Sequence, residues 1–140
     1  TQAHFARSVL ESIAYEYAYY LRILRAAIPT LELTETRVIG GGARSTSWNQ
    51  IKADVLGVPY QRLGRTEFGS WGSAMIAGKA AGVFDDLTAV AMAHAEPAGS
   101  PLAPDPANHA AYQPLVARHI ALQATLRDTF TQGAQASRLP

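Results

Sequence analysis

The chain has 140 residues, a formal net charge of +1 and 48% hydrophobic residues, and a single domain of this size buries roughly 68% of the surface that its unfolded chain exposes. It contains no cysteine, which excludes disulfides, thiolate zinc sites and a cysteine nucleophile. The near-neutral charge argues against a nucleic-acid partner, and without a membrane-length apolar run or a signal-peptide pattern we expect no membrane contact and a cytoplasmic protein.

Apolar residues recur every three or four positions over residues 3–28 and predict one long helix, which Pro29 ends. The tyrosines between positions 15 and 20 point in several directions around its axis, which is typical of a helix that is buried on more than one side. The chain enters this helix at once and starts at Thr1, without methionine. We therefore expect a piece of a longer protein or a processed product.

The next segment predicts a buried strand, a glycine-rich turn, a helix and a second strand, at residues 36–40, 40–44, 46–56 and 58–63. Ser45 or Thr46 can cap the helix, and Gly57 can end it. Pro59 places the second strand at a sheet edge or makes it a strand start. Two strands are too few for a free-standing sheet of typical size. Either further strands exist, or chain outside this sequence completes the sheet.

The second half of the chain is predicted to be helical, with one interruption. A stripe of small residues marks the helix at 67–81, and Asp85 or Asp86 can cap a short helix at 87–93. The proline-rich stretch 96–107 predicts an irregular surface loop. A last helix begins at Pro106, and Pro114 is expected to kink or restart it. We expect a frayed tail at 132–140, and we interpret residues 1–140 as a single domain or a fragment.

The glycine turn is the sharpest local feature. Glycines at the carboxyl end of a strand let a ligand approach the main chain, and the following helix points free N–H groups toward the turn. The turn lacks the Gly-Lys-Ser/Thr ending of a P-loop, and Ser45 breaks the Gly-x-Gly-x-x-Gly pattern. On local chemistry alone, both a phosphate or nucleotide contact and a merely tight strand–helix turn remain open.

Three ordered motifs carry a family resemblance. The first is Gly40-Gly41-Gly42-Ala43-Arg44-Ser45 with Trp48, Gln50-Ile51, Ala53-Asp54 and Leu56-Gly57-Val58-Pro59; the others are residues 7–15 and 67–77, the latter with Gly82 and Phe84. Together they resemble the C-terminal domain of the FGGY carbohydrate kinases, with the xylulokinase branch closest. The resemblance implies an α/β fold that is part of an actin-like ATPase (ribonuclease H-like) domain, helix-rich with few strands in this chain.

The resemblance also implies a function. The chain would be the ATP-binding part of a sugar kinase, which transfers the γ-phosphoryl of ATP, with Mg²⁺, to a hydroxyl of a pentulose or related sugar or polyol. Gly41, Gly42 and Ala43 would line the nucleotide, and a polar contact to the base or ribose would come from Ser45, Thr46 or Asn49. The catalytic aspartate and most of the sugar site would belong to a missing N-terminal kinase domain. We therefore expect no catalytic residue here and no activity of the chain alone.

Plainer interpretations stand beside these. Asp54 resembles a metal ligand or base, but its place inside a helix favours a surface or packing role. The four histidines lack ligand spacing, and Arg44 could meet either a phosphate or an acid. The alternative function is a non-catalytic α/β binding or assembly module that keeps the turn only for its structure. Because the first helix is apolar on several faces and a sheet edge is unpaired, we also expect self-association into a homo-oligomer.

Overall fold

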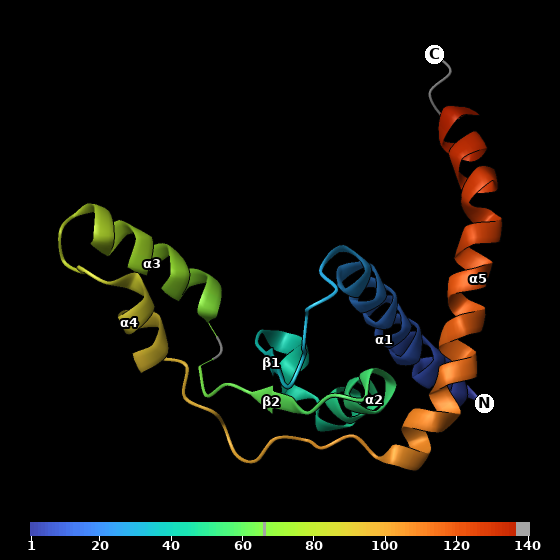
Figure 1. Cartoon of the computed structure of the whole chain (residues 1–140), viewed down its shortest axis with the longest axis horizontal. Coiled ribbons are helices and arrows are strands. Elements are labelled where there is room, and N and C mark those ends of the chain that lie inside the picture. The colour runs from blue at the N-terminus through green and yellow to red at the C-terminus, as the bar shows by residue number, and fades with distance from the viewer. Residues whose placement is uncertain (66, 137–140) are drawn as a thin grey trace.

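The computed structural model describes residues 1–65 and 67–136. In chain order its elements are α1 (Gln2–Ala27), β1 (Thr36–Val38), a 3₁₀ turn (Gly41–Arg44), α2 (Thr46–Leu56), β2 (Tyr60–Arg62), α3 (Phe68–Ala80), α4 (Leu87–Ala93) and α5 (Pro106–Ala136). Figure 1 shows α1, α2 and α5 gathered on one side of the two strands, with α3 and α4 projecting on the other. The expected helix-rich α/β chain with few strands is confirmed.

The core is built by α2 together with α1 and α5, the first and last helices of the chain. Ala14 of α1, Val55 of α2, and Tyr112 and Val116 of α5 form its buried cluster. The phenol of Tyr112 donates to Glu11 Oε1 at 2.9 Å and so joins α5 to α1 by a polar contact as well. The core therefore depends on residues about a hundred positions apart.

The Asp54 carboxylate holds the start of α5 against α2. The side chain is 3% exposed, and its Oδ1 accepts hydrogen bonds from the backbone N–H of Asp105 and from Gln50 Nε2, both at 2.8 Å. Its Oδ2 accepts from Asn108 Nδ2 at 3.0 Å. All three donors lie within the protein, so Asp54 has a packing role rather than that of a base or metal ligand.

The sheet has two short parallel strands and a third, irregular neighbour. Thr36 of β1 lies opposite Tyr60 of β2, and β1 is only partly buried, not fully buried as predicted. The proline-rich segment runs antiparallel along the other edge of β2, where Tyr60 and Leu102 exchange hydrogen bonds of 3.0 and 2.9 Å. The stretch 96–105 is irregular and largely exposed, as predicted, but it also makes isolated bridges to β2 and to Leu63 that we did not predict. Its prolines lack N–H groups, but Ala98 and Leu102 between them donate to β2.

The hairpin of α3 and α4 stands apart from the helical core. Neither helix has a buried residue, and they pack chiefly against each other. Asp86 caps α4 as expected, since its Oδ1 accepts from the N–H groups of Thr88 and Ala89 at 2.8 and 3.1 Å. The small-residue stripe at Gly69 and Ser73 is exposed, so no close helical neighbour covers it within the described residues.

The last helix is longer and more regular than predicted. It continues through Pro114, so the expected restart does not occur. Proline removes one helical hydrogen bond, but Tyr112 and Val116 are both buried in the core and hold the helix on either side. The expected frayed tail is helical as far as Ala136, since glutamine and alanine favour helix, and residues 137–140 lie outside the described residues.

Candidate functional site

The glycine turn leaves its main chain open at the carboxyl end of β1. Gly40 has φ +83° and ψ −174°, a conformation that is essentially restricted to glycine. A Cβ added at Gly40 or Gly41 would meet no atom within 4 Å, whereas one at Gly42 would lie 2.8 Å from Trp48 Cζ3. A ligand can therefore approach the backbone at Gly40 and Gly41, while Gly42 gives its space to the indole ring.

The N-terminus of α2 is occupied by its own cap. The Ser45 side chain accepts a hydrogen bond from the Trp48 backbone N–H at 3.3 Å, and a 3₁₀ turn separates β1 from α2. The expected cap at Ser45 is confirmed. The hydroxyl predicted to contact a base or ribose is thus used within the protein, and fewer free N–H groups point at the turn than we expected.

A positively charged cavity of about 390 Å³ lies where the carboxyl ends of β1 and β2 meet. Gly40 and Ala43 line it together with three arginines, Arg44, Arg62 and Arg65. The Arg65 guanidinium packs over the Trp71 ring, 4.7 Å from its centroid, and lies 3.3 Å from His94 Nδ1. None of its described lining residues is acidic, and the ion pairs of the described residues use Arg7 and Arg37 instead. Arginine matches phosphate geometry through paired N–H groups, so this cavity is suited to a polyphosphate.

A smaller cavity of about 150 Å³ adjoins the first. Thr46 and Asn49 of α2 line it together with Ala43 and Arg62, which line the arginine cavity as well. Asn49 Nδ2 donates to the Ala43 carbonyl at 2.8 Å, which fixes the amide orientation and leaves the buried Oδ1 without a partner in the structure. An unpaired buried acceptor favours a ligand or water that brings an N–H or O–H donor.

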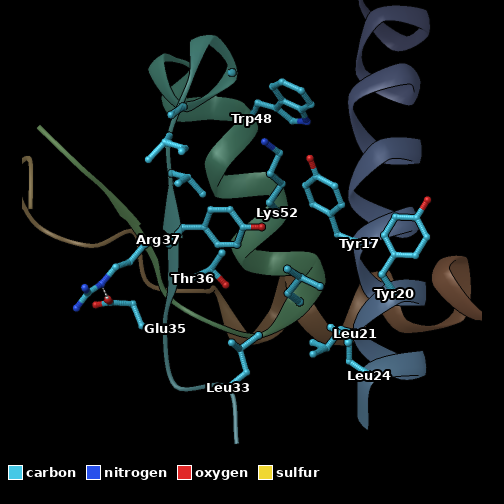
Figure 2. Close-up of a pocket in the computed structure, with 16 residues that line it drawn as sticks. Tyr17, Tyr20, Leu21, Leu24, Leu33, Glu35, Thr36, Arg37, Trp48 and Lys52 are labelled. Atoms are coloured by element: carbon cyan, nitrogen blue, oxygen red, sulfur yellow. Dashed lines mark hydrogen bonds and ion pairs between the residues drawn. The ribbon is translucent and has the colours of Figure 1, made fainter. Parts of the chain in front are cut away.

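A third cavity, about 700 Å³, lies on the other side of the turn, between α1, β1 and α2. Figure 2 shows the Lys52 amine inside it, beside Tyr17 and Trp48. Lys52 is only 5% exposed, its Nζ lies 3.6 Å from the centroid of the Trp48 ring, and burial lowers its pKa. Within the described part of the chain, it has no hydrogen bond or ion pair. We call this cavity the α1–β1 groove.

The predicted site residues lie around the glycine turn, but they face different cavities. Ala43 borders all three, Gly42 faces the groove, and Thr46 and Asn49 face the small cavity. Gly41 is exposed and borders none of them.

Sequence reasoning missed four residues of these cavities: Gly40, Arg62, Arg65 and Lys52. The signal for the arginines was present, because the carboxyl ends of parallel strands meet at one edge of a sheet. Lys52 lies four residues after Trp48, so the two share one face of α2. Among the described residues, no group of three or more His, Asp or Glu could hold a metal ion, and no helix is long and apolar enough to span a membrane.

Comparisons with known proteins agree on one family. The model of the FGGY family of carbohydrate kinases, C-terminal domain, matches residues 1–81. A glycerol kinase from Acinetobacter baylyi is 38% identical over 91 residues, which are 65% of this chain and 18% of that protein. A xylulose kinase from Staphylococcus epidermidis is 38% identical over 87 residues, covering 62% of this chain and 17% of the relative.

A solved structure extends the likeness beyond the matched segment. The xylulose kinase from Rhodospirillum rubrum superposes with a TM-score of 0.67 at 30% identity, over 94% of this chain and 26% of that one. This confirms the predicted fold class, part of an actin-like ATPase domain. The chain spans less than a fifth of the length of the two curated relatives. The curated relatives include glycerol kinases at up to 45% identity and a xylulose kinase at 38%, and the solved structure is a xylulose kinase.

Proposed function

Since the chain belongs to the FGGY family of carbohydrate kinases, within their C-terminal domain, we propose that it is the ATP-binding part of a sugar kinase. The intact enzyme transfers the γ-phosphoryl of ATP to a hydroxyl of a pentulose or a related sugar or polyol. The observation that carries this proposal is the arginine cavity. It places Arg44, Arg62 and Arg65 beside the open main chain of Gly40, at the carboxyl ends of both parallel strands.

The nucleotide would lie across the point where the two smaller cavities meet. The arginines would bind phosphate oxygens, while Ala43 and the side chains of Thr46 and Asn49 would contact the ribose or base. Supporting this arrangement, Asn49 Oδ1 still lacks a hydrogen-bond donor and Ala43 borders both cavities. Gly41 would contribute through its exposed main chain, whereas Ser45 and Gly42 would act indirectly by shaping the turn.

The remaining parts of the reaction would lie outside these residues. Mg²⁺ needs carboxylate or water oxygens, and the described lining of the arginine cavity has no acid, so the metal would enter with the nucleotide and be held by another domain. Its chemistry would be to neutralise charge on the transferred phosphoryl. The catalytic aspartate and the sugar site would belong to that N-terminal domain. We further propose a cytoplasmic enzyme without nucleic-acid or membrane partners.

The experiment compares steady-state kinetics of the full-length protein and its Arg62→Ala variant with a pentulose as substrate. We expect the KM for ATP to rise about tenfold, because one charged contact to phosphate contributes about 1.5 kcal/mol, while the KM for the sugar stays unchanged. Arg118→Ala, an exposed arginine on α5, is the matched control. A raised KM for the sugar with an unchanged KM for ATP would show that the cavity binds the sugar and not ATP.

A second test uses the 140-residue chain itself. It should show no sugar-dependent ADP production with ATP, Mg²⁺ and a panel of pentuloses and polyols, because positioning of both substrates supplies most of phosphoryl-transfer catalysis. Sugar-dependent turnover that copurifies with the chain would contradict the proposal that the catalytic aspartate and the sugar site lie in another domain.

One observation favours the alternative, a non-catalytic binding or assembly module. Large apolar side chains of α1 are exposed, among them Phe5 at 73%, Tyr20 at 52% and Leu24 at 49%. Large apolar side chains exposed along a helix favour self-association. Sedimentation velocity over a dilution series can refute this candidate. A module built for assembly stays dimeric or larger at low micromolar concentration, and a monomer there removes the case for it.

A further inference from the structure

One arginine of the arginine cavity is held by aromatic side chains. The Arg65 guanidinium lies over the Trp71 ring, 4.7 Å from its centroid, and its Nη2 is 3.3 Å from His94 Nδ1. The Trp71 and His94 rings pack edge to face, with 4.6 Å between their centroids and 75° between their planes. The three side chains therefore contact one another in a single cluster, which we call the Arg65 stack.

The Arg65 stack joins the α3–α4 hairpin to the cavity. Arg65 lies between β2 and α3 and lines the arginine cavity, whereas Trp71 belongs to α3 and His94 follows the last residue of α4. Figure 1 shows this hairpin projecting from the strands, away from the helical core. Among the described residues, the side-chain hydrogen bonds and ring contacts that link the hairpin to the rest of the chain pass through Arg65. The position of Arg65 therefore depends on the hairpin.

The stack leaves most of the donors of Arg65 free. A guanidinium carries only donors, so His94 Nδ1 must accept, and the Trp71 ring covers the face of the guanidinium rather than its N–H edge. The other N–H groups of Arg65 have no partner among the described residues. Glu96 lines a neighbouring cavity of about 420 Å³ together with Arg65, but the two form no ion pair. The free N–H groups are therefore available to phosphate oxygens.

The other two arginines of the cavity are not held in this way. Within the described part of the chain, Arg44 and Arg62 have no side-chain hydrogen bond, ion pair or ring contact. A long free side chain loses rotamer freedom when it binds a ligand, whereas a side chain that is already held loses less. Arg65 is therefore the arginine whose position is set before a nucleotide binds.

We propose that Trp71 and His94 are positioning residues, which hold the Arg65 guanidinium in the arginine cavity with its free N–H groups toward a phosphate of the nucleotide. This inference rests on the proposed function, in which that cavity binds the phosphates of ATP. It extends the nucleotide site to the α3–α4 hairpin, although neither aromatic residue touches ATP. Because coupling between two equilibria is reciprocal, a bound nucleotide in turn steadies the hairpin through Arg65.

The first measurement is a double-mutant cycle on the full-length protein, with the KM for ATP as its readout and a pentulose as second substrate. We expect Arg65→Ala to raise this KM about tenfold and Trp71→Leu to raise it about two- to fivefold, because a charged contact and a cation–π contact are lost. In the Arg65→Ala background, Trp71→Leu should have no further effect, since Trp71 acts through Arg65. The same effect of Trp71→Leu in both backgrounds overturns the proposal.

Conservative variants separate positioning from folding. Trp71→Phe keeps a ring against the guanidinium and His94→Asn keeps an acceptor, so both should leave the KM for ATP within about twofold of the wild-type value. His94→Leu removes the acceptor and should raise this KM about two- to fivefold, with kcat and the KM for the sugar unchanged. Met92→Ala, at an exposed position of α4, is the matched control. If His94→Asn is as impaired as His94→Leu, the residue is merely structural and the proposal fails, even where Trp71→Leu does not fold.

The arginine variants distinguish failure of this inference from failure of the proposed function. If neither Arg62→Ala nor Arg65→Ala changes the KM for ATP, the cavity does not bind the nucleotide and both proposals are refuted. If both arginine variants raise the KM while Trp71→Leu and His94→Leu leave it unchanged, positioning by the hairpin is refuted and the proposed function stands.

Discussion

Replacing Asp54 should destabilise the fold without changing the catalytic step. The carboxylate accepts three hydrogen bonds, from the Asp105 N–H, Gln50 Nε2 and Asn108 Nδ2, at 2.8, 2.8 and 3.0 Å. A hydrogen bond to a charged group contributes about 1.5 kcal/mol, so the three together contribute about 4–5 kcal/mol. Water can solvate part of the freed Gln50 and Asn108 amides, which reduces the expected loss in Asp54→Ala to about 3–4 kcal/mol. Asp54→Asn keeps one acceptor oxygen and should lose about 1–2 kcal/mol.

Urea unfolding of the 140-residue chain measures these losses directly, with equal m-values required for the comparison. Asp85→Ala is the matched control, because that side chain is exposed and should change stability by less than about 0.5 kcal/mol. In the full-length enzyme, Asp54→Asn should leave kcat unchanged at temperatures where the variant is folded. A kcat lowered by orders of magnitude with an unchanged unfolding midpoint would refute this account and return Asp54 to the catalytic candidates.

Three further predictions concern the turn and the core. Gly42→Ala should displace the Trp48 ring, cost about 1–3 kcal/mol and change the Trp48 fluorescence; an unchanged spectrum would mean that the ring does not lie against the turn. Gly57→Ala should cost about 2–4 kcal/mol, because φ is +67° and the new Cβ would lie 2.6 Å from the His109 ring; a loss below 1 kcal/mol in urea unfolding would contradict that packing. Burial raises the pKa of Tyr60 above the ordinary value of about 10. The contribution of Tyr60 to the free energy of unfolding is therefore complete below about pH 10 and falls at higher pH, where tyrosine in the unfolded chain ionises first. Tyr60→Phe should flatten this decline, and an equal slope in the variant would assign the decline to another group.

Local patterns predicted the elements well because their causes are local. The periodicity of 46–56, the Ser45 cap and the glycine at position 57 give α2 the bounds that the structure shows. The partner of β2 could not be predicted in the same way. Residues 96–102 have no strand-like alternation, and their pairing depends on the register that β2 sets. Proline-rich composition indicates the lack of a regular strand, but it does not exclude isolated hydrogen bonds from the residues between the prolines.

The unusual backbone of the glycine turn was predicted for the same reason. Consecutive glycines indicate an unusual backbone conformation, and Gly40 adopts one. Which cavity Gly42 faces depends on Trp48, which lies in the first turn of α2. Arg62 at the end of β2 and Arg65 after it carry no motif of their own. They join the turn only because β1 and β2 run parallel and end at the same edge. Residues brought together by topology need the fold before they can be recognised as a site.

The packing of α1 against α5 determines when the core can form during synthesis. Ala14 meets Val116, and Tyr112 reaches Glu11, so the core closes only after the last helix has left the ribosome. At roughly 5–20 residues per second, α1 waits on the order of 5–20 s with Ala14 and Tyr15 uncovered. During that interval the exposed apolar surface makes the nascent chain prone to aggregation, the hazard that chaperones counter. A slow codon run before residue 106 would lengthen the wait and lower the yield of folded protein, without changing a single amino acid.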